Sequence, residues 1–282
     1  MENHSGIFIN CQGKLWDFGR PKIMGIVNVT PDSFYADSRA DSDKKLLSKV
    51  AAMISEGADI IDIGGYSSRP GATDIPEEEE IRRVVPAIEK MRKEFPDMPV
   101  SVDTFRSRVA KEALDAGACM VNDISGGTLD ENMIPLIGRK KVPYVLMHMR
   151  GTPQTMQDNP VYENIITDIN RFFAVQLKKL KEHNVNDVIL DPGFGFGKTL
   201  EHNYTILKNL DKFLWHNKPI LVGISRKSML FKVLNGKPGD MLNATTVANT
   251  IALMKGASVL RVHDVREARE AVDIFLKMRD AE

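Results

Sequence analysis

The amino-acid sequence predicts an α/β fold, namely a (β/α)8 TIM barrel with a short N-terminal β-hairpin. Eight short apolar runs recur along the 282 residues, segments of helical periodicity separate the runs, and each run ends in polar or charged residues. Parallel strands that are buried on both faces read as apolar runs, and such a barrel carries its functional side chains where those strands end. An open doubly wound sheet is the main alternative. Eight successive units without a dinucleotide-binding fingerprint favour the closed barrel.

Strands and helices alternate along the chain, which is typical of βα units around a parallel sheet. The expected strands, each with the polar residues that end it, are 23–27 with Asn28, 60–61 with Asp62, 100–102 with Asp103, 120–121 with Asn122 and Asp123, 144–147 with His148, 188–190 with Asp191, 220–224 with Ser225, and 259–260 with Arg261 and His263. The expected helices are 44–56, 77–94, 106–116, 131–139, 161–182, 200–213, 243–255 and 265–278, with a further helical stretch from Met229. The acidic run 77–80 is expected to be the solvated first turn of its helix.

The first 20 residues alternate in polarity around Gly13, which predicts a hairpin that closes the barrel floor. Residues 21–282 are then the barrel, and 1–282 are a single domain, because the length suits one barrel and no linker interrupts it.

Charge and cysteine content exclude several classes of protein. Lys plus Arg and Asp plus Glu each number 38, so no net field favours binding to nucleic acid or to an anionic membrane. No apolar stretch approaches the roughly 18 to 20 residues of a membrane span, and the N-terminus lacks the apolar region of a signal peptide. Cys11 and Cys119 are far apart in sequence and lack metal-ligand spacing, so neither a disulfide nor structural zinc is expected. Free thiols predict a cytoplasmic protein.

Basic and hydroxyl side chains gather after the seventh and eighth strands. The seventh run leads through Gly223 and Ser225 to Lys227 and a helix start, where backbone N–H groups and the helix dipole favour an anion. Arg261 and His263 are alternate residues that share one face of the eighth strand. Beside the seventh loop they would form the phosphate corner common in such barrels, which predicts an anionic substrate group. The alternative is an ordinary capped helix with basic surface residues.

The segment 191–199 is rich in glycine and ends in Gly-Lys-Thr. Pro192 occupies the position where a P-loop needs glycine, so a nucleotide loop is not expected. The glycines let the backbone fold tightly over a site, and Phe194 or Phe196 offers a ring face to a flat ligand.

Three acceptor side chains, Asp103, Asn122 and Asp191, end the third, fourth and sixth strands. Carboxylates in a mostly apolar barrel mouth need partners that offset their desolvation. One interpretation is recognition of a heterocycle with adjacent N–H donors, such as a 2-amino-4-oxo pyrimidine edge. The other is internal salt bridging to Lys227 or Arg261.

Further residues complete the expected pocket. Met147 is expected in its wall rather than at a metal. The long polar loops 28–34 and 64–71 follow the first two strands and are candidate lids.

The order of these motifs resembles the dihydropteroate synthase family over almost the whole chain. The matching segments are 24–34, 68–71, 101–104, 122–127, 191–198, 225–228 and 261–264. The resemblance implies a transferase that joins 6-hydroxymethyl-7,8-dihydropterin pyrophosphate to p-aminobenzoate in folate biosynthesis, with release of pyrophosphate. It implies an ionisation-type mechanism without a protein nucleophile. It also implies a cytoplasmic homodimer that uses Mg²⁺ and is a sulfonamide target.

The resemblance assigns a role to each matching residue. The pterin would be held by Asp103, Asn122, Met147, Asp191, Gly223 and Lys227. Pyrophosphate and Mg²⁺ would be held by Asn28, Arg261 and His263, with Asn28 as the metal ligand. p-Aminobenzoate would be held by Phe34, Ser68, Arg69, Pro70, Phe196 and Ser225. The expected catalytic residues are Asn28, Lys227, Arg261 and His263.

Two segments depart from the family pattern. Tyr66 stands where the family commonly has Glu, and 35–39 replace a shorter Ser-Asp-Gly-Gly, so the role of Asp37 as the loop acid stays open. One alternative is a binding module, the pterin-binding barrel of corrinoid-dependent methyltransferases, which should lack the Ser-Arg-Pro loop and the Ser-Arg-Lys-Ser corner. Another is a family paralogue without activity, for which Tyr66 is the only indication.

Overall fold

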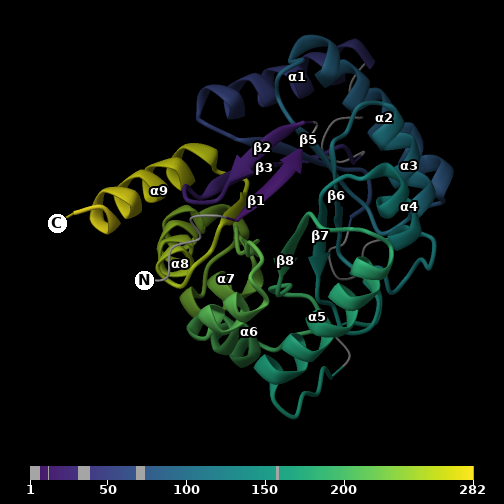
Figure 1. Cartoon of the computed structure of the whole chain (residues 1–282). Helices are drawn as coiled ribbons and strands as arrows, with labels where there is room; N and C mark the ends of the chain where they lie inside the picture. Colours follow the sequence, from purple (N-terminus) through teal and green to yellow (C-terminus); the bar gives the residue numbers. More distant parts are fainter. Residues whose placement is uncertain (1–6, 12, 31–38, 68–73, 157–158, 282) are drawn as a thin grey trace.

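The strands of the central sheet are parallel and are surrounded by helices (Figure 1). The computed structural model describes residues 7–11, 13–30, 39–67, 74–156 and 159–281. Within them, eight strands lie in the order β8-β7-β6-β5-β4-β3-β10-β9. A parallel bridge between Leu190 and Ile220 brings β8 beside β9 and nearly closes the ring. The predicted barrel fold is confirmed, and the single-domain assignment of 1–282 stays a prediction.

The strands and helices lie close to their expected ranges. The barrel strands are β3 (Lys22–Asn28), β4 (Ile60–Gly64), β5 (Val100–Asp103), β6 (Met120–Asp123), β7 (Tyr144–Met147), β8 (Val188–Asp191), β9 (Leu221–Val222) and β10 (Val259–Val262). The α-helices are α1 (Arg39–Ser55), α2 (Glu77–Glu94), α3 (Ser107–Asp115), α4 (Met133–Lys140), α5 (Ile165–Glu182), α6 (Leu200–Lys208), α7 (Ser228–Leu234), α8 (Leu242–Met254) and α9 (Val265–Arg279). Two 3₁₀ helices are η2 (Leu210–His216) and η3 (Pro238–Asp240).

The helix expected over 200–213 is wrong in one respect, because it is divided at Asn209 into α6 and η2. The Asn209 side-chain amide donates to the carbonyl of Thr205 at 2.9 Å. A short polar side chain that bonds the local backbone competes with helix continuation, which explains the break.

The hairpin closes the floor of the barrel, as the sequence predicted. β1 (Phe8–Cys11) pairs antiparallel with β2 (Lys14–Asp17). Along β1, Ile9 and Cys11 are buried, whereas the alternate residues are exposed. The buried side packs against residues near the amino ends of the barrel strands, namely Met24, Ile60, Met120, Val145, Ile189, Leu221 and Val259. The carboxyl ends of the strands are left at the opposite rim.

The larger core lies between the sheet and the helices. On α2, Val84, Ile88 and Met91 are fully buried, a spacing that places them on one helix face. That face joins a core that includes Ile61 and Ile63 of β4. The strands are therefore apolar on both faces, and polar side chains accumulate where the strands end.

Glu80 corrects the expectation that 77–80 is a solvated turn. Its side chain is fully buried, and its Oε2 accepts a hydrogen bond from Arg106 Nη1 at 2.9 Å. Glu80 precedes Val84 by one helical turn and so faces the sheet. Burial raises the pKa of its carboxyl, with Thr104 and Arg106 opposing the shift.

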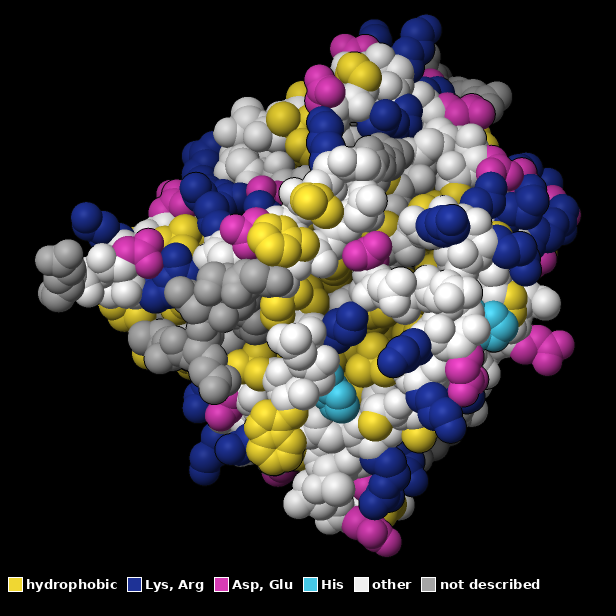
Figure 2. Space-filling model, viewed as in Figure 1, with side chains coloured by type: hydrophobic (Ala, Val, Ile, Leu, Met, Phe, Trp, Pro, Cys, Tyr) yellow, Lys and Arg dark blue, Asp and Glu magenta, His cyan; other side chains and the backbone are white. Residues whose placement is uncertain are grey.

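Acidic and basic side chains are interspersed on the face shown in Figure 2, which agrees with the equal numbers of the two charges. None of the described helices combines the length and apolar content that a membrane span requires.

Candidate functional site at the carboxyl-end rim

The candidate site is the rim formed by the carboxyl ends of the barrel strands. The predicted site residues that the structure describes all lie there, namely Asn28, Asp103, Asn122, Met147 and Asp191 at strand ends, Arg261 on β10 with His263 just after it, and Phe196, Gly223, Ser225 and Lys227 in the loops after β8 and β9. Their individual roles stay predictions. The predicted residues Phe34, Ser68, Arg69 and Pro70, and also Asp37, lie outside the described residues.

Arg261 makes the central contacts of the rim. Its Nε donates to Asp62 Oδ2 at 2.6 Å, and its Nη2 donates to Asp103 Oδ2 at 2.6 Å. Asn122 Nδ2 donates to the same Asp62 oxygen at 2.9 Å. These bonds connect β10, β4, β5 and β6. The interpretation of internal salt bridging is therefore confirmed for Asp103 and Arg261.

Burial and charge act against each other in this network. Burial raises the pKa of Asp103 to about 7, while the Arg261 charge opposes the rise and the Asp62 charge adds to it. Burial would lower the pKa of Arg261, but Asp62 and Asp103 raise it above its ordinary value. Arg261 therefore stays a cation, and Asp103 changes its charge near neutral pH.

A second cation, Lys227, lies between the loops after β8 and β9. Its Nζ donates to the carbonyl of Phe194 at 2.5 Å and lies 4.6 Å from the ring centroid of Phe196. Burial lowers the pKa of Lys227 to about 8, and the Asp191 charge opposes the shift. Burial also raises the pKa of Asp191, with Lys227 opposing. Lys227 and Asp191 are thus close enough to influence each other's charge.

Gly223 lies between the two cations. A Cβ there would stand 3.9 Å from both Arg261 Cβ and Lys227 Nζ, so a longer side chain would crowd both groups. A wall of Ile124, Met147, Met149 and Met156, with Phe105 and Phe196 packed against it, lies on the same rim. Apolar surfaces with a few fixed polar groups are typical of small-molecule sites.

The glycine-rich loop after β8 packs directly on the loop after β7. Gly193 has φ +72°, and a Cβ there would lie 2.0 Å from the carbonyl oxygen of His148. Lys198 joins the two loops, because its Nζ donates to the carbonyls of His148 and Phe196 at 3.2 and 2.9 Å. Burial lowers the pKa of Lys198 well below its usual range. Burial likewise lowers the pKa of His148 to about 2, so its ring is neutral.

Ser225 and His263 form the corner beside Arg261. Ser225 Oγ lies 3.0 Å from His263 Nδ1 and accepts from the His263 backbone N–H at 3.2 Å. Burial and the Arg261 charge together lower the pKa of His263 to about 4. His263 therefore offers a neutral ring at pH 7. The turn into α7 is held by Arg226, which has φ +57° and pairs with Asp264 through Nε and Nη2.

Comparison with known proteins adds independent evidence. Residues 24–263 match the family model described as pterin binding enzyme. Dihydropteroate synthase from Escherichia coli strain K12 is 40% identical over 266 residues, which cover 94% of each chain. The crystal structure of the Yersinia pestis dihydropteroate synthase with a sulfonamide drug has a TM-score of 0.91 at 40% identity, covering 98% of this chain and 100% of that one.

The chain belongs to the dihydropteroate synthase family. A dihydropteroate synthase from Xanthomonas albilineans, solved with 4-aminobenzoic acid, has a TM-score of 0.90 at 34% identity and covers 98% of this chain and 99% of its own. Family membership makes the chain a transferase of folate synthesis.

Tyr66 lies at the start of the loop after β4. Its hydroxyl accepts from Gln154 Nε2 at 2.8 Å, its ring packs edge-on against Phe105, and Arg106 lies over the ring at 5.2 Å. These contacts tie the start of the loop after β4 to the loop after β7. Burial raises the pKa of Tyr66, so the phenol is neutral at pH 7.

Asp62 was assigned no role from the sequence, although it ends an expected strand. It is fully buried, and its Oδ2 accepts from both Arg261 and Asn122. Lys198 was also missed as the residue that joins two loops. Its place in a Gly-Lys-Thr segment directly after a glycine loop was the available signal.

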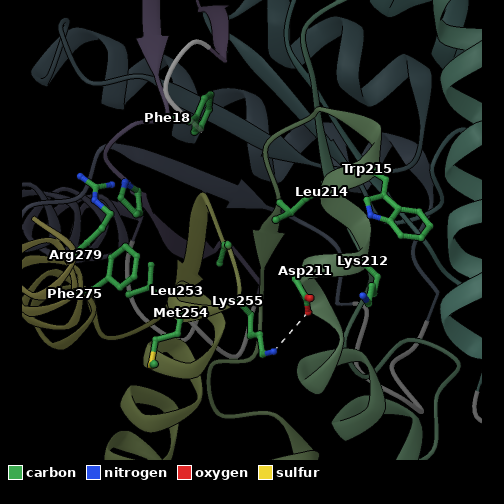
Figure 3. A pocket seen from close by; sticks show the side chains of 13 residues that line it. Phe18, Asp211, Lys212, Leu214, Trp215, Leu253, Met254, Lys255, Phe275 and Arg279 are labelled. Atoms are coloured by element: carbon green, nitrogen blue, oxygen red, sulfur yellow. Dashed lines mark ion pairs between the residues drawn. The ribbon is translucent and has the colours of Figure 1, made fainter. Parts of the chain in front are cut away.

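A cavity of about 260 Å³ lies away from the rim, beside the floor of the barrel. Figure 3 shows it between η2, the end of α8 and α9, with Trp215 and Phe275 on opposite sides and an ion pair between Lys255 and Asp211. None of the predicted site residues lines it, so it carries no part of the assignment.

The Gly193 contact generates a prediction. In Gly193→Ala, the methyl group would collide with the His148 carbonyl, and the positive φ disfavours alanine. We expect the free energy of unfolding to fall by about 1–3 kcal/mol, measured by urea denaturation, and pterin affinity to fall at least about tenfold in calorimetry. In the control Gly239→Ala, the Cβ meets no atom within 4 Å, and both quantities should be unchanged. Normal stability and affinity in Gly193→Ala would show that the close packing is not required.

Proposed function

We propose that the chain condenses 6-hydroxymethyl-7,8-dihydropterin pyrophosphate with p-aminobenzoate to give 7,8-dihydropteroate and pyrophosphate. The observation that carries the proposal is the rim network of Asp62, Asp103, Asn122 and Arg261 beside the Asp191 and Lys227 pair. It combines hydrogen-bond acceptors for a pterin edge with a buried cation for a diphosphate.

The pterin part of the proposal rests on acceptors of matched chemistry. A 2-amino-4-oxo pyrimidine edge presents adjacent N–H donors, and carboxylate and amide oxygens at Asp103, Asn122 and Asp191 accept such bonds. Lys227 supplies a donor for the ring oxygen. The absence of a side chain at Gly223 and the apolar cluster containing Met147 suit a flat ring. The match of 24–263 to the pterin binding enzyme model supports the same ligand class.

The choice of p-aminobenzoate as the second substrate is supported by a related solved structure and by the corner that Ser225 forms with His263. The Xanthomonas albilineans enzyme was solved with 4-aminobenzoic acid. In this chain we assign the aryl acid to Phe196 and Ser225, together with Phe34, Ser68, Arg69 and Pro70. A sulfonamide drug is bound in the Yersinia pestis structure, and we extend sulfonamide binding to this chain.

The proposed reaction begins with ionisation of the bond between the pterin methylene and the pyrophosphate oxygen. The bonding electrons leave with pyrophosphate, and the dihydropterin ring delocalises the positive charge on carbon. The arylamine nitrogen then forms the new C–N bond and loses a proton. Arg261 stabilises the leaving group by charge; its Nη1 makes no hydrogen bond to the described residues. The neutral His263 adds a hydrogen bond, and no protein nucleophile is needed.

Mg²⁺ fits the residues at the end of β3. The metal prefers oxygen ligands and is commonly held by one or two protein groups together with phosphate oxygens and water. Asn28 Oδ1 and Asp103 Oδ2 both lie near Gly64, at 3.7 and 3.6 Å from the position that a Cβ would take there. Asn28 would hold the ion, and the bound ion would neutralise charge on pyrophosphate.

A homodimer is part of the proposal. Helix α8 contains no charged residue, and it is buried on the side of Ala248 and Leu253. Val247, Ile251 and Met254, at spacings of four and three, are each 41% or more exposed. A helix that is apolar on both sides is expected to be covered on both sides, and we assign the outer side to a second copy of the chain.

The proposed compartment is the cytoplasm.

The first prediction of this proposal concerns the reaction itself. Mixing the protein with dihydropterin pyrophosphate, p-aminobenzoate and Mg²⁺ should yield dihydropteroate, measured by chromatography.

Arg261→Ala should reduce the single-turnover rate by about 100-fold or more, because a fixed cation at developing charge contributes on that scale. Arg82→Ala is the control, since Arg82 is exposed and, among the residues that the structure describes, forms an ion pair only with Glu79. An Arg261→Ala enzyme with the rate of the Arg82→Ala control would remove Arg261 from the mechanism.

A second prediction concerns pH. The carboxyl of Asp103, with its pKa raised to about 7, takes up a proton as the pH falls. Lys227, with its pKa lowered to about 8, loses a proton as the pH rises. If both charged forms bind the pterin, affinity should peak between these values and fall by up to about tenfold per pH unit on the acid side. Calorimetry should show that Asp103→Asn binds more weakly and lacks the acid limb. A wild-type affinity that stays flat between pH 5.5 and 7, roughly the range of that titration, would contradict this assignment.

A third prediction concerns the outer side of α8. Sedimentation should give a dimer for the wild-type protein and a monomer for Ile251→Glu, because a buried unpaired carboxylate opposes association. The matched control is Val175→Glu, at an exposed apolar position of α5; it should remain dimeric. A dimer that persists in Ile251→Glu would place the interface elsewhere.

A further inference from the structure

Two cysteines meet at the barrel floor, far from the rim. Cys11 is the last residue of β1, and Cys119 directly precedes β6. Both are buried, at 3% and 1% exposure. Their Sγ atoms are 2.7 Å apart although 108 residues separate them in the chain, and neither is bridged. Sequence separation alone does not predict this contact, because the two positions are brought together by the hairpin lying across the floor.

The hairpin is attached to the barrel mainly through side-chain packing. Its buried side joins the floor cluster, to which Cys11 and Cys119 both belong. Among the described residues of the hairpin, few polar contacts to the barrel assist: the Asn10 N–H donates to Asp187 Oδ1 at 3.2 Å, and Lys14 lies 3.9 Å from Asp97 in an exposed pair. A covalent bond at Cys11 would therefore be the strongest attachment of β1 to the barrel.

We propose that Cys11 and Cys119 are a site of reversible disulfide formation, in which a small-molecule disulfide such as oxidised glutathione cross-links the hairpin to the barrel. A disulfide has an S–S length of about 2.05 Å, so the sulfur atoms need to approach by less than about 1 Å from their present separation.

The chemistry is two successive thiol–disulfide exchanges. The Cys119 thiolate attacks one sulfur of the oxidant and releases the first small thiol. The Cys11 thiolate then attacks Cys119 Sγ in the mixed disulfide and releases the second. Two protein thiols are oxidised, one small disulfide is reduced to two thiols, and the two protons lost by the cysteines are taken up by those thiols.

The environment favours this order of attack. The hydrogen bond from Cys11 lowers the pKa of Cys119, and the Arg92 charge lowers it further. The same hydrogen bond raises the pKa of Cys11. Thiolate is the reactive form, so Cys119 is the first nucleophile and Cys11 the resolving thiol.

Oxidation is expected to stabilise the fold without altering the rim. The cross-link closes a loop of about 100 residues, a length at which the loss of entropy from the unfolded chain is large. We expect Tm to rise by roughly 10 °C, with kcat and KM unchanged because the bond lies at the opposite end of the barrel.

Both cysteines are buried in the folded protein and are poorly accessible to glutathione. The full chain is therefore refolded from guanidine in a buffer of reduced and oxidised glutathione. After acid quenching, the chain is alkylated in denaturant, and bound alkyl groups are counted by mass spectrometry. The expected product has no alkylated cysteine, no bound glutathione, and the mass of one chain less two hydrogen atoms. Peptide mapping should find Cys11 joined to Cys119, and reductant should restore two alkylated cysteines and lower Tm.

Single variants provide the controls. Cys11→Ser and Cys119→Ser should each give a mixed disulfide with glutathione, or a free thiol, and a Tm that does not change between oxidising and reducing buffers. The proposal would be overturned if refolded wild-type protein kept two alkylatable thiols, carried only glutathione, or formed disulfides only between chains. Because the decisive measurement uses the wild-type chain, poor folding of a variant does not weaken the test.

Discussion

The guanidinium of Arg261 lies between two carboxylates, and the rest of the rim is arranged around that contact. Placing charges in a mostly apolar barrel mouth carries a large desolvation cost, which only close and well-directed partners offset. Asp62 and Asp103 supply such partners at 2.6 Å each. Asn122 shares the Asp62 oxygen, so one cation fixes side chains from three neighbouring strands. Binding groups that are fixed in this way need little reorganisation when a ligand arrives.

The same contact explains why the two sides of the rim have different character. Toward β8 and β9, Lys227 and Asp191 moderate each other's charge, and the glycine loop places Phe196 beside them. Toward β10, Ser225 and His263 form a neutral pair next to Arg261. One region therefore combines a cation and a carboxylate with an aromatic ring, and the other places neutral hydrogen-bonding groups beside a cation. Gly223 lies between them, because a Cβ there would stand 3.9 Å from both Arg261 Cβ and Lys227 Nζ.

Much of the fold and site was predictable because parallel strands make strand ends neighbours. The apolar runs gave the strands, and the residues at their ends gave Asp103, Asn122, Asp191 and Arg261. That Asp62 on β4 is also a partner of Arg261 depends on the register between β4 and β10, which lie on either side of β3. Pattern alone could not supply that register, so Asp62 was assigned no role.

The other features that the sequence did not predict also have local causes. Glu80 belongs to an acidic run, and its burial depends on which helix face meets the sheet and on Arg106 from a different element. The Cys11 contact with Cys119 depends on how the hairpin crosses the floor, which sequence separation does not reveal. The break at Asn209 depends on one side chain bonding the backbone of the preceding turn. In each case a tertiary or side-chain interaction overrides a pattern that is correct on average.

The hairpin floor has a consequence for how the chain acquires its structure. Its two strands are synthesised before the barrel strands, yet the cluster they complete includes Leu221 and Val259, which are more than 200 residues later in the chain. The packing of the hairpin must therefore wait for these later strands. Contacts of such long sequence separation slow folding, and a hairpin that waits for these later strands exposes an apolar surface that favours aggregation.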